Sequence, residues 1–196
     1  MDEIADPFGD FDLNELDEPA QEYEVRDAQG RLVAVQVRTF DKRIWWKTPG
    51  GKLGLGGIAM KELPLYRSER LRTVPLEVLV VVTEGPKDCD AIWRARMPAV
   101  GTMTGASGVP SAASLEVLRG RVVVLWPDND VAGHMHMERV ADALIGVARE
   151  IRWLNVPGLP PKGGAFDVPV EEIPRLVYTY ARVTRAGVGS SSEGRG

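Results

Sequence analysis

An uninterrupted apolar run, Val78 to Val82, constrains the fold most strongly, because it leads directly into Thr83, Glu84 and Gly85. Such a run is typical of a strand that is covered on both faces, as in a parallel sheet. Further short strands are predicted at residues 99–102, 122–126 and 151–154, and helices at 88–96, 111–118, 131–150 and 170–180. Strands that alternate with helices predict an α/β unit, a parallel four-stranded sheet flanked by helices.

The segment before this unit follows a different pattern. Residues 22–26, 32–40 and 44–46 alternate apolar and polar side chains, and turn-forming residues separate them. This predicts a small antiparallel β subdomain that exposes Arg and Lys side chains. We therefore divide the chain into a disordered acidic leader (1–20), a small basic β subdomain (21–76), an α/β domain (77–182) and a flexible tail (183–196).

The net charge of −4 is an average over unlike parts of the chain. Residues 1–20 carry eight acidic side chains and no basic one, whereas residues 21–76 carry eleven basic and six acidic side chains. The remainder is close to neutral. The overall charge therefore excludes neither DNA nor RNA as a partner.

A single cysteine, Cys89, limits both the compartment and the metal chemistry. It excludes a disulfide framework and a Cys-based zinc ribbon, so we expect a reducing, cytoplasmic setting and no zinc. His134 and His136 would point to different sides of a helix, which also argues against a zinc site. The apolar runs are far shorter than the roughly 20 residues of a membrane helix, so no membrane partner is expected. The acidic N-terminus predicts no secretory signal.

Acidic side chains follow two of the predicted buried strands. Glu84 follows the strand that ends at Thr83, and Asp128 and Asp130 follow the strand over 122–126. Because the carboxyl ends of parallel strands meet at one edge of a sheet, we expect these carboxylates to converge. In an extended segment, Asp128 and Asp130 would also point the same way. Carboxylate oxygens suit Mg²⁺, and two such ions stabilise phosphoryl transfer. The simpler alternative is that these acids only cap helices or form turns.

Aromatic and basic residues lie together in the β subdomain. Trp45 and Trp46 stand among four basic residues, Lys42, Arg43, Lys47 and Lys52. Such a surface could stack bases and contact phosphates, which makes Trp46 and the four basic residues candidate nucleic-acid contacts. A solvated face with one packed Trp explains the pattern equally well.

Three segments, VVVTEGPKDCDAIW, GTMTGASG and VVVLWPDNDVAG, resemble the successive motifs of a TOPRIM domain, the module shared by bacterial-type primases, topoisomerases and some nucleases. The phage and plasmid primase-like members are similar also in the loop LPPKGGAFDV, residues 159–168, and in the β segment. The resemblance covers about residues 22–172. It departs at Gly108 to Ser111, where many members have a Lys and an aromatic residue.

The resemblance implies a DNA primase-like nucleotidyltransferase of DNA replication, with Mg²⁺ or Mn²⁺ as cofactor. Its partners would be a DNA template, ribonucleotides and a replicative helicase or another primase subunit, in a bacterial cell or a phage-infected host. The alternatives are a TOPRIM nuclease and a non-catalytic nucleic-acid-binding accessory subunit. The absence of a zinc ribbon within the chain favours the accessory role, because that module selects the template in complete primases.

The motif positions also imply residue roles. Glu84 matches the general acid or base and a metal ligand, and Asp128 and Asp130 match the catalytic, metal-binding acids. Asp88 matches an acid that supports the metal cluster, and Asp167 matches a further acid near the metals. Lys87 matches a phosphate contact. For these last three residues, a first-turn acid, a helix cap and a solvated lysine are the structural alternatives.

Overall fold

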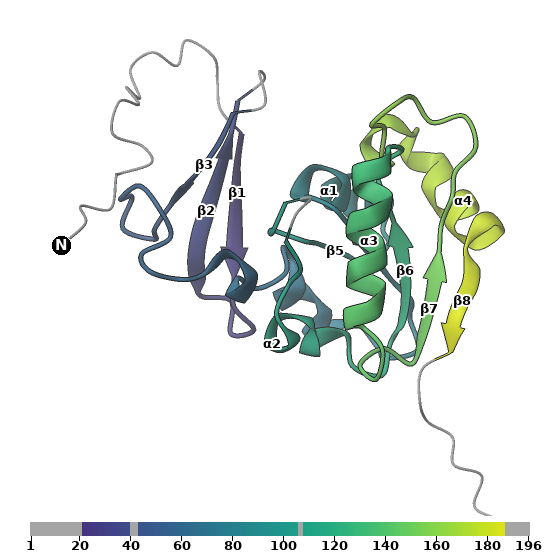
Figure 1. Ribbon diagram of the computed structural model, residues 1–196, viewed down its shortest axis with the longest axis horizontal. Helices are drawn as coiled ribbons and strands as arrows, with labels where there is room; N and C mark the ends of the chain where they lie inside the picture. The colour runs from purple at the N-terminus through teal and green to yellow at the C-terminus, as the bar shows by residue number, and fades with distance from the viewer. Residues whose placement is uncertain (1–20, 40–42, 106–107, 187–196) are drawn as a thin grey trace, which may run out of the picture.

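The small sheet has the predicted antiparallel architecture. The computed structural model describes residues 21–39, 43–105 and 108–186. Within it, three strands pair in the order β1-β2-β3 and stand beside a larger α/β unit (Figure 1). Their bounds are β1 (Gln21–Arg26), β2 (Leu32–Arg38) and β3 (Ile44–Lys47). The acidic leader and residues 187–196 lie outside the described residues, so the expectations for them stay predictions.

The larger sheet has the strand order β5-β4-β6-β7-β8. The first four strands of this order are parallel, as predicted, and their bounds are β4 (Val80–Thr83), β5 (Ala99–Gly101), β6 (Val122–Trp126) and β7 (Glu150–Trp153). The fifth, β8 (Arg182–Ala186), is antiparallel to β7. The prediction of a flexible tail from residue 183 is therefore wrong for residues 183–186. The free edge of β7 offers backbone groups that β8 pairs with, whatever its side chains.

In the part of the chain that the structure describes, four α-helices and several 3₁₀ turns connect the strands. They are α1 (Pro86–Arg94), α2 (Ala112–Leu115), α3 (Val131–Ala143) and α4 (Ile173–Tyr180), with η2 (Met60–Glu62), η3 (Ser68–Thr73), η4 (Glu116–Leu118), η5 (Ala165–Asp167) and η6 (Val170–Glu172). Helix α3 ends well before the predicted residue 150, because Gly146 turns the chain at a φ of +78° and β7 begins at Glu150. In the described ranges no helix is both long and apolar enough to cross a membrane.

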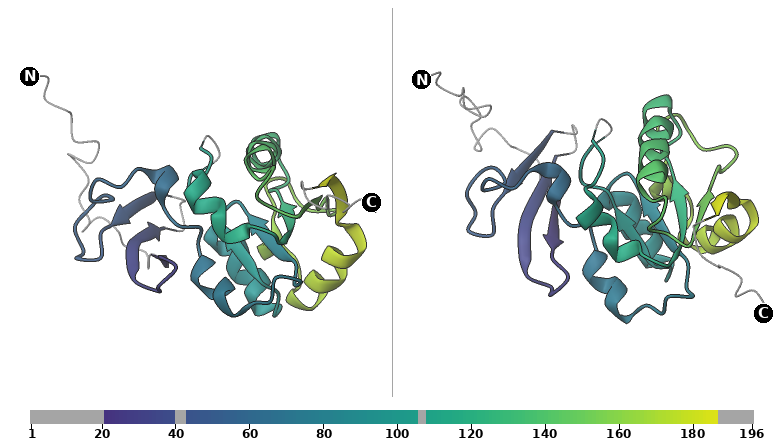
Figure 2. Two further views of the ribbon diagram at one scale, coloured as in Figure 1. Left: turned by 90° about the horizontal axis from the view of Figure 1, so that it is seen from below. Right: turned by 60° about the horizontal axis from the view of Figure 1, so that its bottom comes forward.

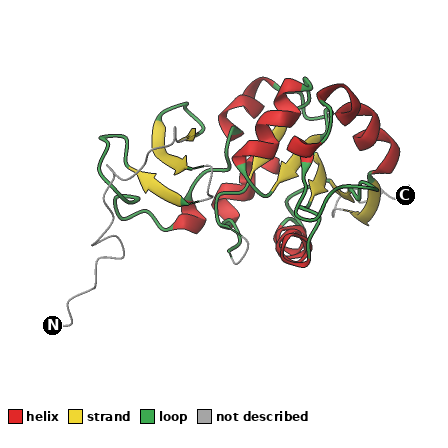
Figure 3. Ribbon diagram, turned by 90° about the horizontal axis from the view of Figure 1, so that it is seen from above, coloured by secondary structure: helices red, strands yellow, loops and turns green. Residues whose placement is uncertain are grey.

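Helices cover both faces of the larger sheet (Figure 3). Val81 and Val124 belong to a core shared with α1 and α4, whereas Val80, Val82 and Leu125 face a second core that includes α2 and α3. All five side chains are fully buried. Burial of each side chain stabilises the folded state by about 1.5–3 kcal/mol, because it removes apolar area from water. The apolar run therefore predicted its environment correctly.

The small sheet packs directly against the α/β unit, as the views in Figure 2 also show. Tyr23 and Trp46 lie in the same core as residues of α1, and the Tyr23 ring meets that of Tyr66 edge-on at 5.8 Å. The opposite face buries Trp45 with Val35. Both faces of the small sheet are thus partly covered. This packing brings the end of β2 towards the carboxyl ends of β4 and β6.

Candidate active site

The carboxylates predicted at the strand ends do lie together. Strands β4 and β6 are direct neighbours, with Thr83 opposite Trp126, so Glu84 and Asp128 leave the sheet side by side. The Glu84 Oε1 accepts a hydrogen bond of 2.8 Å from the backbone N–H of Asp128. Glu84 therefore ties the two strand ends together as well as presenting a carboxylate.

Asp88, in the first turn of α1, points to the same place from a third element. A methyl group added to Gly164 would lie 2.5 Å from Oδ1 of Asp88 and 2.9 Å from Oδ1 of Asp128. The two carboxylates thus converge on one point, and the glycine leaves room for them. Gly133 serves the same purpose on α3, because a methyl group there would collide with the Glu84 carboxylate and the Asp128 backbone. We call Glu84, Asp88 and Asp128 the carboxylate cluster.

The electrostatics of the carboxylate cluster favour a cation. Burial raises the pKa of Asp128 to about 7, and the negative charges of Asp88 and Glu84 add to this effect. Burial also raises the pKa of Glu84 and of Asp88. The positive charge of Arg38, at the end of β2, partly offsets the rise for both aspartates. Bringing the three groups together in ionised form is therefore unfavourable unless further positive charge is present.

The donor set fits Mg²⁺ or Mn²⁺ in a water-rich coordination. Among the residues that the structure describes, no three Asp, Glu, His or Cys side chains are gathered closely enough to hold a metal ion on their own. Mg²⁺ does not require this, because it is commonly held by one or two carboxylates together with water and phosphate oxygens. Asp88 and Asp128, which converge beside Gly164, are the pair that would hold it.

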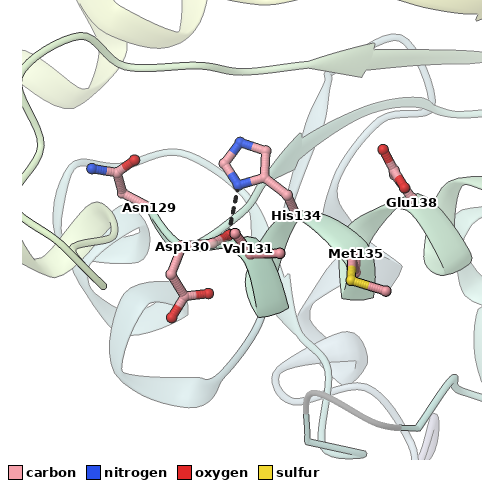
Figure 4. Close-up of a pocket in the computed structure, with 6 residues that line it drawn as sticks. All are labelled: Asn129, Asp130, Val131, His134, Met135 and Glu138. Atoms are coloured by element: carbon pink, nitrogen blue, oxygen red, sulfur yellow. Dashed lines mark hydrogen bonds between the residues drawn. The ribbon is translucent and has the colours of Figure 1, made fainter.

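Asp130 caps a helix at the border of the carboxylate cluster. Its Oδ1 accepts the Gly133 N–H at 2.7 Å, and its backbone carbonyl accepts a hydrogen bond of 2.9 Å from Nδ1 of His134 (Figure 4). The chain bends here, since the Asp130 N–H lies 2.8 Å from the Asp128 carbonyl oxygen. The expectation of an extended Asp128–Asp130 segment is therefore wrong. Asp130 still raises the pKa of Glu84 and Asp128 through its charge.

Asp167 and Lys87 lie next to the carboxylate cluster with structural contacts of their own. The Asp167 Oδ2 accepts the Gly164 N–H at 3.0 Å, which closes η5, and its charge raises the pKa of Asp88. The Lys87 Nζ sits 3.6 Å from the centre of the Phe166 ring. The metal and phosphate roles of these two residues stay predictions.

The basic residues of the small sheet do not form the predicted stacking surface. Trp46 is only 6% exposed and belongs to the core, so its ring faces are not available to a base. Lys47 forms an ion pair of 2.9 Å with Glu22. Arg43 and Lys52 are exposed, whereas Lys42 lies outside the described residues. The alternative of a solvated face with one packed Trp comes closer, although both Trp45 and Trp46 are packed, one on each face of the sheet.

Several residues that shape the carboxylate cluster were not predicted from the sequence. Arg38 acts on Asp88 and Asp128 only because the small sheet packs against the α/β unit, and no local sequence pattern predicts this packing. Thr102 donates a hydrogen bond of 2.9 Å to the Glu84 carbonyl and lies 2.9 Å from Nε2 of the fully buried His136. The occurrence of His136 on the buried face of α3 is the one sequence signal that could have revealed this support.

The architecture places the chain in a class of proteins with two parts, in which a small antiparallel sheet packs on an α/β unit. The α/β unit carries carboxylates at its strand ends. No protein-family model matches the chain, and no curated protein matches it. Solved structures do match. The chain has the fold of DNA primase catalytic cores, which confirms the predicted fold class and the resemblance to primases at the level of structure.

Three solved structures illustrate this similarity. A DNA primase domain from Pseudomonas aeruginosa has a TM-score of 0.63 at 19% identity, over 84% of this chain and 52% of that one. The Escherichia coli primase catalytic core has a TM-score of 0.62 at 17% identity, over 84% and 53%. The primase fragment of the bacteriophage T7 primase–helicase protein has a TM-score of 0.57 at 20% identity, over 81% and 60%. The chain thus spans about half to three fifths of these structures.

Proposed function

We propose that this chain carries a metal-dependent nucleotidyl-transfer centre of the primase type, which joins ribonucleotides on a DNA template. The observation that carries the proposal is the convergence of Asp88 and Asp128 beside Gly164, at the carboxyl ends of strands in a primase-like fold. Mg²⁺ or Mn²⁺ bound there would neutralise and orient the oxygens of a nucleoside triphosphate.

The chain's own residues would perform the remaining tasks. Glu84, whose pKa burial raises, is suited to accept a proton from the attacking hydroxyl group. Arg38 and Lys87 place positive charge beside the carboxylates, where phosphate groups would lie. Asp130 fixes the start of α3, and Gly133 and Gly164 leave the space that the carboxylates occupy.

A non-catalytic accessory role is the second candidate, and one observation favours it. Among the described residues, no three acids lie within metal-binding reach of one another, so a metal ion there would have two carboxylate ligands only. In this case the chain would bind nucleic acid, and a partner such as a replicative helicase or another primase subunit would complete the machinery of replication.

Primer synthesis on a single-stranded DNA template tests the proposal. With Mg²⁺ we expect incorporation of labelled ribonucleotides, and Asp128→Asn or Glu84→Gln should reduce it to background while the fold is retained. Glu171→Gln, at an exposed position outside the carboxylate cluster, is the matched control. Wild-type rates in both cluster variants would refute the proposal. Metal-dependent cleavage of the strand without incorporation would establish a nuclease instead, and strand binding without either reaction would establish the accessory role.

A further inference from the structure

A pocket with an excess of positive charge lies beside α1. Its volume is about 570 Å³, and its lining comes from β1, from η3 with the residue before it, from α1 and from η5. We call it the α1 pocket. Among the described residues that line it, Arg67, Arg70, Lys87 and Arg94 are basic and Asp90 is acidic.

Most of the positive charge of the α1 pocket is not neutralised by neighbouring acids. Asp90 is ion-paired with Arg67, and the nearest carboxylate oxygen to Arg70 belongs to Glu69, at 3.8 Å. In the part of the chain that the structure describes, Lys87 and Arg94 have no ion-pair partner. Both approach the Phe166 ring instead, at 3.6 Å and 5.7 Å from its centre. The α1 pocket is therefore suited to an anionic occupant.

The chain itself enters the α1 pocket at Gln21. Gln21 is the first residue that the structure describes, and it is part of the lining. Its position is fixed, because it pairs with Arg38 of β2 and its Oε1 accepts a hydrogen bond of 2.6 Å from the Tyr23 hydroxyl group. The acidic leader, residues 1–20, is joined to this residue by a peptide bond. It therefore starts at the edge of the α1 pocket.

The composition of the acidic leader is complementary to the α1 pocket. It carries eight acidic side chains and no basic one, and Phe8 and Phe11 stand among the acids. Its carboxylates can pair with the exposed Arg70 and Arg94, and its rings can contact the same guanidinium groups or the Phe166 ring, which is 44% exposed. Cations and exposed rings thus meet anions and rings.

The covalent connection makes even a weak contact effective. Phe8 and Phe11 stand thirteen and ten residues before Gln21. At about 3.3 Å per residue, an extended chain of this length reaches about 33–43 Å, so both rings can span the pocket. A segment tethered in this way has an effective concentration in the millimolar range. Several ion pairs that are each weak at a protein surface are then enough for occupancy, and salt should weaken them.

We infer that the acidic leader docks in the α1 pocket of its own chain and covers the positive charge there. Its carboxylates pair with Arg70 and Arg94. Lys87 is less suited to them, because it adjoins Asp88 of the carboxylate cluster, which repels other acids. Any polyanion that enters the α1 pocket has to displace the acidic leader. The inference goes beyond the proposed function and does not depend on it, since docking requires neither a metal ion nor a reaction.

Paramagnetic relaxation NMR on the full chain in EDTA tests the contact. A nitroxide label is attached at Gly9→Cys, between the two phenylalanines, while the fully buried Cys89 stays unlabelled. At low salt the label should broaden the amide signals of Arg70, Arg94 and Phe166. The reference is a four-acid variant, Asp6→Asn, Asp10→Asn, Asp12→Asn and Glu15→Gln, which keeps the length of the tether. Its broadening should be weaker, and about 1 M salt should reduce the wild type to the same level.

Substitutions in the α1 pocket should have the same effect as those in the acidic leader. Arg70→Ala/Arg94→Ala should lose the additional broadening at Phe166. Arg119→Ala/Arg149→Ala, a matched pair of exposed arginines outside the lining, should keep it. The four-acid variant should also bind inorganic polyphosphate about 2- to 10-fold more tightly in titration calorimetry, if a contact with a Kd of about 0.1–1 mM competes at a millimolar effective concentration. This gain should vanish when Arg70 and Arg94 are replaced as well.

Three results would overturn the inference. The first is equal broadening in the wild type and the four-acid variant at low salt. The second is equal affinity of these two proteins for polyphosphate. The third is broadening that arises only between molecules, in a mixture of spin-labelled chains and ¹⁵N-labelled chains without the nitroxide, which would assign the contact to the leader of a second copy. Primer synthesis is measured independently, so its failure counts against the proposed function alone.

Discussion

The Asp128→Asn substitution should stabilise the metal-free protein at pH 8. The pKa of Asp128 lies at about 7 in the folded chain, against 3.8 for an unperturbed aspartate. Each pH unit of such a difference equals about 1.4 kcal/mol, which sets a ceiling of about 4 kcal/mol for the cost of the ionised carboxylate. Solvent contact of the half-buried group reduces this to about 1–2 kcal/mol. Asparagine keeps the shape and removes the charge, so the free energy of unfolding should rise by that amount.

The stability difference between Asp128→Asn and the wild type should change with pH in one direction. The folded chain binds a proton at Asp128 more tightly than the unfolded chain does, so between about pH 4 and pH 7 this group makes the wild type less stable as the pH rises. The advantage of Asp128→Asn should therefore be largest at pH 8 and shrink towards pH 5. Mg²⁺ should stabilise the wild type at pH 8 and stabilise Asp128→Asn less, since the ion loses a ligand and the repulsion is already relieved.

Urea unfolding of both proteins and of the exposed-site control Glu171→Gln, at pH 5, 6, 7 and 8 with and without Mg²⁺, measures these differences. The control should follow the wild type at every pH. An Asp128→Asn protein that is less stable than the wild type at pH 8, or that differs from it equally at all pH values, would refute the electrostatic account of the carboxylate cluster.

Two further substitutions test the geometry around the carboxylate cluster. Gly164→Ala should lower stability by about 1–3 kcal/mol and weaken Mg²⁺ binding, because its methyl group would lie 2.5 Å from Oδ1 of Asp88, whereas Gly85→Ala meets no atom within 4 Å and should be tolerated. Urea unfolding and Mg²⁺ titration calorimetry compare the two, and equal behaviour would contradict the crowding at Gly164. Arg38→Ala should raise the pKa of Asp88 and of Asp128, since it removes a positive charge that lowers both. Carboxyl ¹³C NMR titration measures this shift, and unchanged midpoints would show that Arg38 does not act on the carboxylate cluster.

The sequence predicted the repeating strand and helix pattern because that pattern depends on local periodicity. It failed where pairing or packing decided the outcome. Residues 182–186 have no distinctive strand pattern, and they pair because β7 has a free edge. The sequence left Trp46 open between a base-stacking surface and a packed position, and the approach of the α/β unit buries it. For Asp130 the sequence left open a metal ligand and a helix cap, and in the structure its side chain caps α3.

The carboxylate cluster, too, was predicted in part from local sequence and decided in part by packing. Sequence alone placed Glu84 and Asp128 after buried strands, and the rule that parallel strands end at one edge was enough to bring them together. It did not reveal that Asp88 and Asp128 converge beside Gly164, because that depends on how the loop over 159–168 folds back onto the sheet.

The sequence by itself determined the strands, the helices and the acids at the strand ends, since these follow from hydrophobic periodicity and from residue types close together in the chain. Only the tertiary structure decided which charges act on one another. Arg38 and Asp128 are far apart in sequence, and the packing of the small sheet makes them electrostatic neighbours. Phe166 and Lys87 are also far apart in sequence, and they come together because the loop over 159–168 folds back onto α1. Electrostatic and stacking energies depend on distances across the fold, and those distances are fixed by the order of the strands and the packing of the two parts.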